Sequence, residues 1–130
     1  MERPDSQQIL KASKRILLID WPDKNLPLGL LNAGFEVFSY SPDKYSKAAC
    51  DGDTVVFEKV EGKPDAVDIV NVFRPESELE GIIARHVLPL GAKIVWLHPP
   101  VTNQNAKELE SLYHINIIQG DNILYVAATL

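Results

Sequence analysis

The feature that most constrains the fold is a short apolar run between two charged residues. Residues 15–20 read Arg-Ile-Leu-Leu-Ile-Asp, with four apolar side chains in succession. A strand with one face in water alternates apolar and polar residues, so an unbroken run of this length predicts a strand buried on both faces. Strands of this kind belong to parallel sheets that helices cover on both sides.

The rest of the chain alternates between strand and helix patterns. Further strands are predicted at 35–40, 54–57, 67–73, 92–97 and 115–118. Helices are predicted at 27–33, from 74 to about 87, and from Thr102 or Asn103 onward, where apolar residues recur at helical spacing. Residues 44–52 are expected to form a loop or weak helix, and 123–128 a short strand or helix.

This alternation predicts the α/β fold class, with right-handed crossovers between parallel strands. We expect one doubly wound, Rossmann-like domain with a mostly parallel sheet of five or six strands and helices on both faces. If the strands are numbered in the order in which they occur along the chain, their expected order across the sheet is 3-2-1-4-5. Residues 1–13 are expected to form an N-terminal arm or short helix, and residues 14–130 the domain itself.

Charge and composition exclude several classes of protein. The net charge of the 130 residues is −5, which disfavours nucleic-acid binding because phosphate contacts need clustered Lys and Arg. No apolar run approaches the roughly 20 residues of a membrane-spanning helix, so no membrane partner is expected. The single cysteine, Cys50, allows no intrachain disulfide and favours a cytoplasmic location.

The sequence lacks the common motifs of catalysis and metal binding. It contains no G-x-G-x-x-G, P-loop, C-x-x-C, H-E-x-x-H or G-x-S-x-G pattern. The three histidines, His86, His98 and His114, are too scattered to predict a shared metal ion. No nucleophile or acid–base pair stands out, so we expect neither an enzyme nor a metal protein.

Three segments in a fixed order carry a family resemblance. Residues 67–78 read Val-Asp-Ile-Val-Asn-Val-Phe-Arg-Pro-Glu-Ser-Glu, residues 91–97 read Gly-Ala-Lys-Ile-Val-Trp-Leu, and Ser41-Pro42 follows the second strand. Together they resemble the small CoA-binding domain family, which is related to the N-terminal domain of the succinyl-CoA synthetase α chain. The resemblance covers about residues 14–122 and is strongest over 66–97. It implies a Rossmann-type fold and coenzyme A, or a related nucleotide, as the ligand.

The resemblance also implies where a ligand would bind, at the carboxyl edge of the sheet. Arg74 offers donors to a phosphate there, although it could instead pair with Glu76 or Glu78. Lys44 and Lys47 follow the second strand and could meet a phosphate on an adenosine ribose, although a solvated charge is the favoured interpretation of each. Phe73 is a pocket candidate, although a strand position favours a core role for an aromatic residue. The candidate ligand-binding residues are Trp21, Lys24, Ser41, Pro42, Lys44, Phe73, Arg74, His98 and Pro99.

The loop after the first strand departs from the family pattern. Members carry Gly and Ser there, whereas residues 20–25 read Asp-Trp-Pro-Asp-Lys-Asn, with two carboxylates where phosphates would lie. This degenerate phosphate loop leaves two hypotheses. The first is a non-catalytic module that binds CoA or a related nucleotide. The second is a family member without ligand that serves as a protein-interaction or homodimerisation module.

Overall fold

β1 (Arg15–Ile19) lies at the centre of a seven-stranded sheet in the computed structural model, which describes residues 5–41 and 43–130. The order across the sheet is β4-β3-β2-β1-β5-β6-β7. The other strands are β2 (Glu36–Tyr40), β3 (Tyr45–Asp51), β4 (Thr54–Lys59), β5 (Ile69–Val72), β6 (Ile94–Leu97) and β7 (Asn116–Ile118). β1 pairs in parallel with β2 and β5, and β6 and β7 extend the parallel part beyond β5.

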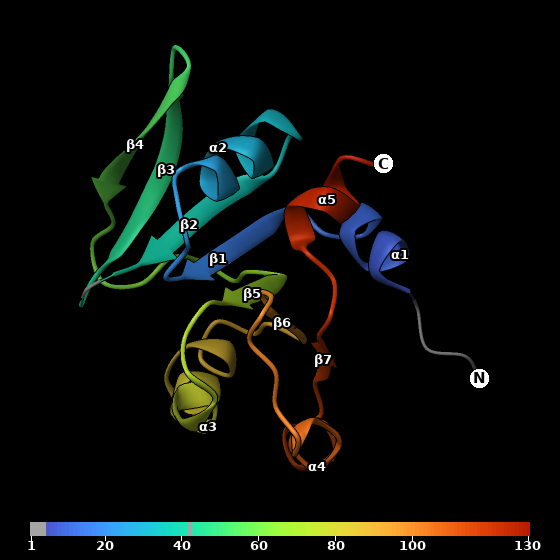
Figure 1. Cartoon of the computed structure of the whole chain (residues 1–130). Coiled ribbons are helices and arrows are strands. Elements are labelled where there is room, and N and C mark those ends of the chain that lie inside the picture. Colours follow the sequence, from blue (N-terminus) through green and yellow to red (C-terminus); the bar gives the residue numbers. More distant parts are fainter. Residues whose placement is uncertain (1–4, 42) are drawn as a thin grey trace.

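Helices cover both faces of the sheet, which confirms the predicted doubly wound α/β class (Figure 1). One face carries α1 (Ser6–Lys11), α2 (Asn25–Asn32) and α5 (Ile123–Ala127). The other carries α4 (Ala106–Tyr113) and a continuous helical segment made of a 3₁₀ turn η1 (Glu76–Glu78), α3 (Leu79–Ile82) and a π-helical turn η2 (Ile83–Val87). Among the described residues, no helix is long and apolar enough to cross a membrane.

The apolar run of β1 feeds two separate cores. Leu17 and Ile19 pack on the α3 and α4 face, whereas Ile16 and Leu18 pack on the α2 and α5 face. All four side chains are buried. The successive apolar residues that defined this strand are therefore divided between the two faces, as strand geometry requires.

The two ends of the chain meet on the α2 face. Ile9 and Leu10 of α1 are buried in the same core cluster as Ile123 of α5. The Gln7 side-chain amide donates to the Thr129 hydroxyl at 2.7 Å. The segment predicted as an arm or short helix thus contains α1, which is packed against the sheet.

The hairpin β3–β4 is the main departure from the expected topology. Residues 44–52 are predicted to form a loop or weak helix, which is wrong for 45–51, because these residues pair antiparallel with β2 and β4. β3 therefore separates the second and third predicted strands and raises the strand count to seven. Its sequence is mostly polar with only Ala48 buried, so its strand geometry depends on its neighbours. Gly52, with φ 64°, provides the left-handed turn of the hairpin.

A core substitution in β1 tests how much stability this central strand contributes. Leu18 is fully buried, and Leu18→Ala should lower the free energy of unfolding by about 2–5 kcal/mol in urea titrations, because it leaves a cavity. Leu112→Ala is the matched control, since the Leu112 side chain is 65% exposed on α4; it should change stability by less than about 0.5 kcal/mol. Equal losses in both variants would contradict the assigned core.

Candidate functional site

A cavity of about 580 Å³ lies at the carboxyl edge of the central strands. The chain leaves β1 through α2 on one face and leaves β5 through η1, α3 and η2 on the other face. Adjacent parallel strands whose connections diverge in this manner create a crevice between their carboxyl ends, where open α/β sheets bind ligands. The cavity is on the α3 side of this crevice, and its volume is within the range of small-molecule sites.

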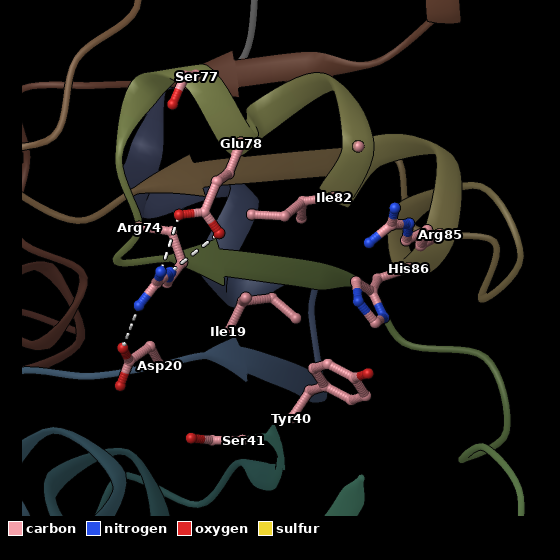
Figure 2. A pocket seen from close by; sticks show the side chains of 11 residues that line it. Ile19, Asp20, Tyr40, Ser41, Arg74, Ser77, Glu78, Ile82, Arg85 and His86 are labelled. Atoms are coloured by element: carbon pink, nitrogen blue, oxygen red, sulfur yellow. Dashed lines mark hydrogen bonds and ion pairs between the residues drawn. The ribbon is translucent and has the colours of Figure 1, made fainter. Parts of the chain in front are cut away.

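The cavity has two chemically different ends (Figure 2). Arg74, Asp20 and Glu78 gather at one end, next to the carboxyl termini of β1 and β5. Arg85 and His86, from the π-helical turn η2, lie at the other end. Between them the lining is made of Ile19 and Ile82, and Tyr40, Ser41, Ser77 and Gly81 complete it.

Arg74 is held by two carboxylates. Its Nε and Nη2 donate to both carboxylate oxygens of Glu78, at 3.2 and 2.8 Å, and its Nη1 donates to Asp20 Oδ2 at 3.2 Å. The hydrogen bonds to Glu78 and then to Asp20 raise the pKa of Arg74, which therefore remains a cation. The Arg74 side chain is 40% exposed, and ion pairs at such positions contribute about 0.2–1 kcal/mol each. An incoming anion can therefore replace these partners at small cost.

Backbone geometry directs Asp20 toward Arg74. Asp20 directly follows β1 and has a positive φ of 63°, a left-handed conformation that aspartate tolerates better than most residues. Its Oδ1 accepts a hydrogen bond from the backbone N–H of Trp21 at 3.0 Å, which leaves Oδ2 for Arg74. The segments that follow β1 and β5 are thus bridged across the crevice.

The opposite end of the cavity is closed by aromatic rings. The His86 ring lies 4.3 Å from the Tyr40 ring, and Tyr45 Oη shares a hydrogen bond with His86 Nδ1. Burial, followed by the charge of Arg85, lowers the pKa of His86 below its usual 6.5. Burial also raises the pKa of Tyr45 above 10.0. Both groups are consequently neutral at pH 7.

The loop after β1 is closed on the α2 face of the crevice. The Trp21 ring stacks on Phe57 of the hairpin, with 5.2 Å between ring centroids. The Asp23 carboxylate accepts the backbone N–H of Asn25 at 2.9 Å and so occupies the amino end of α2. Pro22 has no N–H to donate. The place where Rossmann folds hold a pyrophosphate therefore already contains a carboxylate.

Two buried polar side chains lie at the same sheet edge. Asn71 of β5 is fully buried, and neither its amide nitrogen nor its oxygen has a partner among the described residues. His98 follows β6, is 5% exposed, and its Nδ1 likewise has no described partner. Burial lowers the pKa of His98, while the nearby Asp23 charge opposes that shift. The His98 ring meets the edge of Phe73 at 5.6 Å.

The structure brings two of the nine predicted site residues into the cavity, Ser41 and Arg74. Trp21, Phe73 and His98 lie near the edge in the contacts described above, but they do not line the cavity. Lys24, Lys44 and Pro99 do not line the cavity either. Lys24 and Lys44 are exposed. Pro99 is half-buried and is joined to Pro100 by a cis peptide bond. Pro42 lies outside the described residues.

Sequence reasoning missed most of the helical wall of the cavity. Glu78, Gly81, Ile82 and Arg85 all line it, and they follow one another at i, i+3, i+4 and i+7. That spacing places them on one face of a helix. The same periodicity marks the core-facing residues of this helix, so the signal was present but pointed equally to packing. Tyr40, as the last residue of β2, could have been identified from its position at the carboxyl edge.

The side chains that line the cavity determine what it can do chemically. Neither Ser41 nor Ser77 has a side-chain hydrogen bond to a histidine or carboxylate among the described residues, so no activated hydroxyl is assembled there. Within residues 5–41 and 43–130, no group of three or more His, Cys, Asp or Glu side chains is placed to hold a metal ion. What the cavity offers is two guanidinium groups, hydroxyls, aromatic rings and an apolar floor.

Comparison with known proteins extends these observations. A family model described as CoA binding domain matches residues 25–128, most of the chain. Three solved structures share the fold: a Thermus thermophilus protein, Prb (a protein redesigned for binding) and a hypothetical protein from Pyrococcus horikoshii. Their identities to this chain are 20%, 18% and 17%, and their TM-scores are 0.67, 0.73 and 0.68. The matches cover 97%, 96% and 100% of this chain and 98%, 89% and 99% of theirs.

The lowered pKa of His86 predicts a pH dependence of stability. The unfolded chain protonates this histidine near pH 6.5, whereas the folded protein does so only at lower pH, so acidification favours unfolding. The free energy of unfolding of the wild type should fall between pH 7.5 and pH 5.5, and His86→Gln should lose less over the same range. Denaturant titrations at both pH values measure the difference.

The exposed His114 provides the control for this measurement, because His114→Asn keeps a residue that tolerates the left-handed backbone there. This variant should retain the full wild-type loss. An identical pH dependence in wild type and His86→Gln would show that His86 is not the residue responsible.

Proposed function

Because the chain belongs to the CoA-binding domain family, we propose that it is a non-catalytic module that binds CoA or a closely related adenine nucleotide at the carboxyl edge of its sheet. The observation that carries the proposal is the cavity of about 580 Å³ at the carboxyl ends of β1 and β5, which Arg74 lines. A cytoplasmic location accords with this function. The family match is the support for CoA as ligand, and the absence of an activated nucleophile in the described cavity is the support for a non-catalytic role.

The nucleotide part of the ligand suits the cavity, and the pantetheine arm extends beyond it. The volume is suited to a ligand of moderate size and is small for the whole of CoA. Ile19 and Ile82 provide an apolar floor, and Tyr40 provides a ring face on which a base can stack. A diphosphate bound at the Arg74 end would replace Asp20 and Glu78 as the partner of Arg74, since guanidinium and phosphate form charge-assisted paired hydrogen bonds.

Replacing Arg74 tests this site. In calorimetric titrations with CoA at near-physiological salt, Arg74→Ala should weaken binding at least tenfold, or about 1.4 kcal/mol. Arg15→Ala is the matched control, because Arg15 also pairs with a carboxylate, Glu36 at 3.0 Å, but lies at the start of β1, the opposite edge of the sheet. Equal affinities for wild type and Arg74→Ala would remove Arg74 from the site. No detectable binding at millimolar CoA would favour the interaction or homodimerisation module instead.

The loop after β1 should weaken CoA binding. Asp23 occupies the α2 amino end and would repel a diphosphate approaching it. Asp23→Asn removes that charge and retains an oxygen for the Asn25 N–H, so it should strengthen CoA binding by about 1 kcal/mol, roughly fivefold. Asp53→Asn, at the exposed turn of the β3–β4 hairpin, should leave the affinity unchanged. An unchanged affinity in Asp23→Asn would mean that the diphosphate does not approach the loop.

A further inference from the structure

Arg85 differs from Arg74 in its surroundings although both line the same cavity. Arg74 has two carboxylate partners, so that end of the cavity carries one positive and two negative charges. No carboxylate of the described residues forms an ion pair with Arg85. The cavity is therefore negative at the Arg74 end and positive at the Arg85 end.

The neighbours of Arg85 leave its charge unopposed. His86 and Tyr45 share a hydrogen bond and are both neutral at pH 7. Together with Tyr40 they form an aromatic wall at the Arg85 end of the cavity. His86 is 7% exposed, so this wall is fixed by packing. An anion at the Arg85 end would meet one exposed guanidinium beside a preformed aromatic wall, with no competing carboxylate among the lining residues there.

The lysines that sequence analysis assigned to a ribose phosphate are placed differently. Lys47 lies in β3, and its Nζ pairs with Glu36 at 3.5 Å. Lys44 is exposed in the turn before β3 and does not line the cavity. Glu78 and Arg85 are seven residues apart on one helical segment, or roughly 10 Å along its axis. Arg85 is thus separated from the carboxylates of Asp20 and Glu78, yet it lines the same cavity (Figure 2).

We propose that Arg85 binds a phosphate ester carried by the ribose of the ligand, so that the site selects 3′-phosphorylated adenine nucleotides such as CoA over dephospho-CoA. The proposal rests on the proposed function and names the group that determines specificity within it. The planar guanidinium provides two parallel donors to phosphate oxygens, a geometry that lysine cannot reproduce. Within residues 5–41 and 43–130, no carboxylate pairs with Arg85 and would have to be displaced, in contrast to Arg74.

A purely structural role for Arg85 is the competing explanation. Arg85 lies in the last turn of a helical segment, where a cation offsets the partial negative charge of the helix end. In that case its removal would lower stability slightly and would affect all ligands alike. The two explanations differ in whether the effect depends on the 3′-phosphate.

The test is a comparison of CoA with dephospho-CoA by isothermal titration at fixed salt. The wild type should bind CoA at least tenfold more tightly. Arg85→Ala should weaken CoA binding at least tenfold and leave dephospho-CoA binding within twofold of wild type, which abolishes the preference. Arg85→Lys retains the charge without the planar guanidinium, so it should keep part of the preference for CoA over dephospho-CoA. Lys107→Ala, an exposed cation on α4 outside the cavity, should behave as wild type.

The outcomes separate this proposal from the broader one. Equal wild-type affinities for CoA and dephospho-CoA would overturn the assignment of Arg85 and leave CoA binding intact. Equal losses for both ligands in Arg85→Ala would also overturn it and favour the structural role. Failure of the wild type to bind either ligand at millimolar concentration would overturn the proposed function itself. Thermal melts of each variant establish that the folded state is retained.

Discussion

The pairing of β1 with β5 is the constraint on which the rest of the structure depends. The two strands are in parallel register from Ile16 and Ile69 to Ile19 and Val72, so their carboxyl ends finish side by side. The segments that follow them run to opposite faces of the sheet. The first residues after each strand therefore lie at the crevice. Asp20 is the first residue after β1 and Arg74 is the second after β5, so strand order brings them to the same edge, where they form an ion pair at 3.2 Å.

This crevice contains its own anions. The carboxylates of Asp20 and Glu78 neutralise Arg74, and the Asp23 carboxylate accepts the backbone N–H of Asn25, the first residue of α2. Each of these groups holds a donor that a phosphate could otherwise use. The exposed ion pairs are individually weak, so they contribute little to stability. A phosphate that bound at this edge would accordingly compete with these internal carboxylates.

The sequence predicts the parallel core well because that core is specified by local patterns. The apolar run of β1 and the Val-rich β5 read as strands without knowledge of their neighbours. β3 could not be predicted in this manner, since its residues are mostly polar and its hydrogen bonds come from β2 and β4. The cavity was predicted only in part for a related reason. Arg74 marks a strand end, whereas the lining by His86 results from a π-helical turn and a tyrosine on another strand.

The two faces of the carboxyl edge have opposite characters, and the first loop explains the difference. On the α2 side, the Trp21 ring is fixed against Phe57 and Asp23 covers the helix end, so that side is closed. On the α3 side, the helical segment begins only at Glu76, after Arg74-Pro75, and the cavity lies between this segment and the strand ends. A glycine-rich loop would bring backbone N–H groups to a ligand on the α2 side. Substitution of that loop by tryptophan, proline and aspartate leaves side chains on the α3 side as the main source of donors.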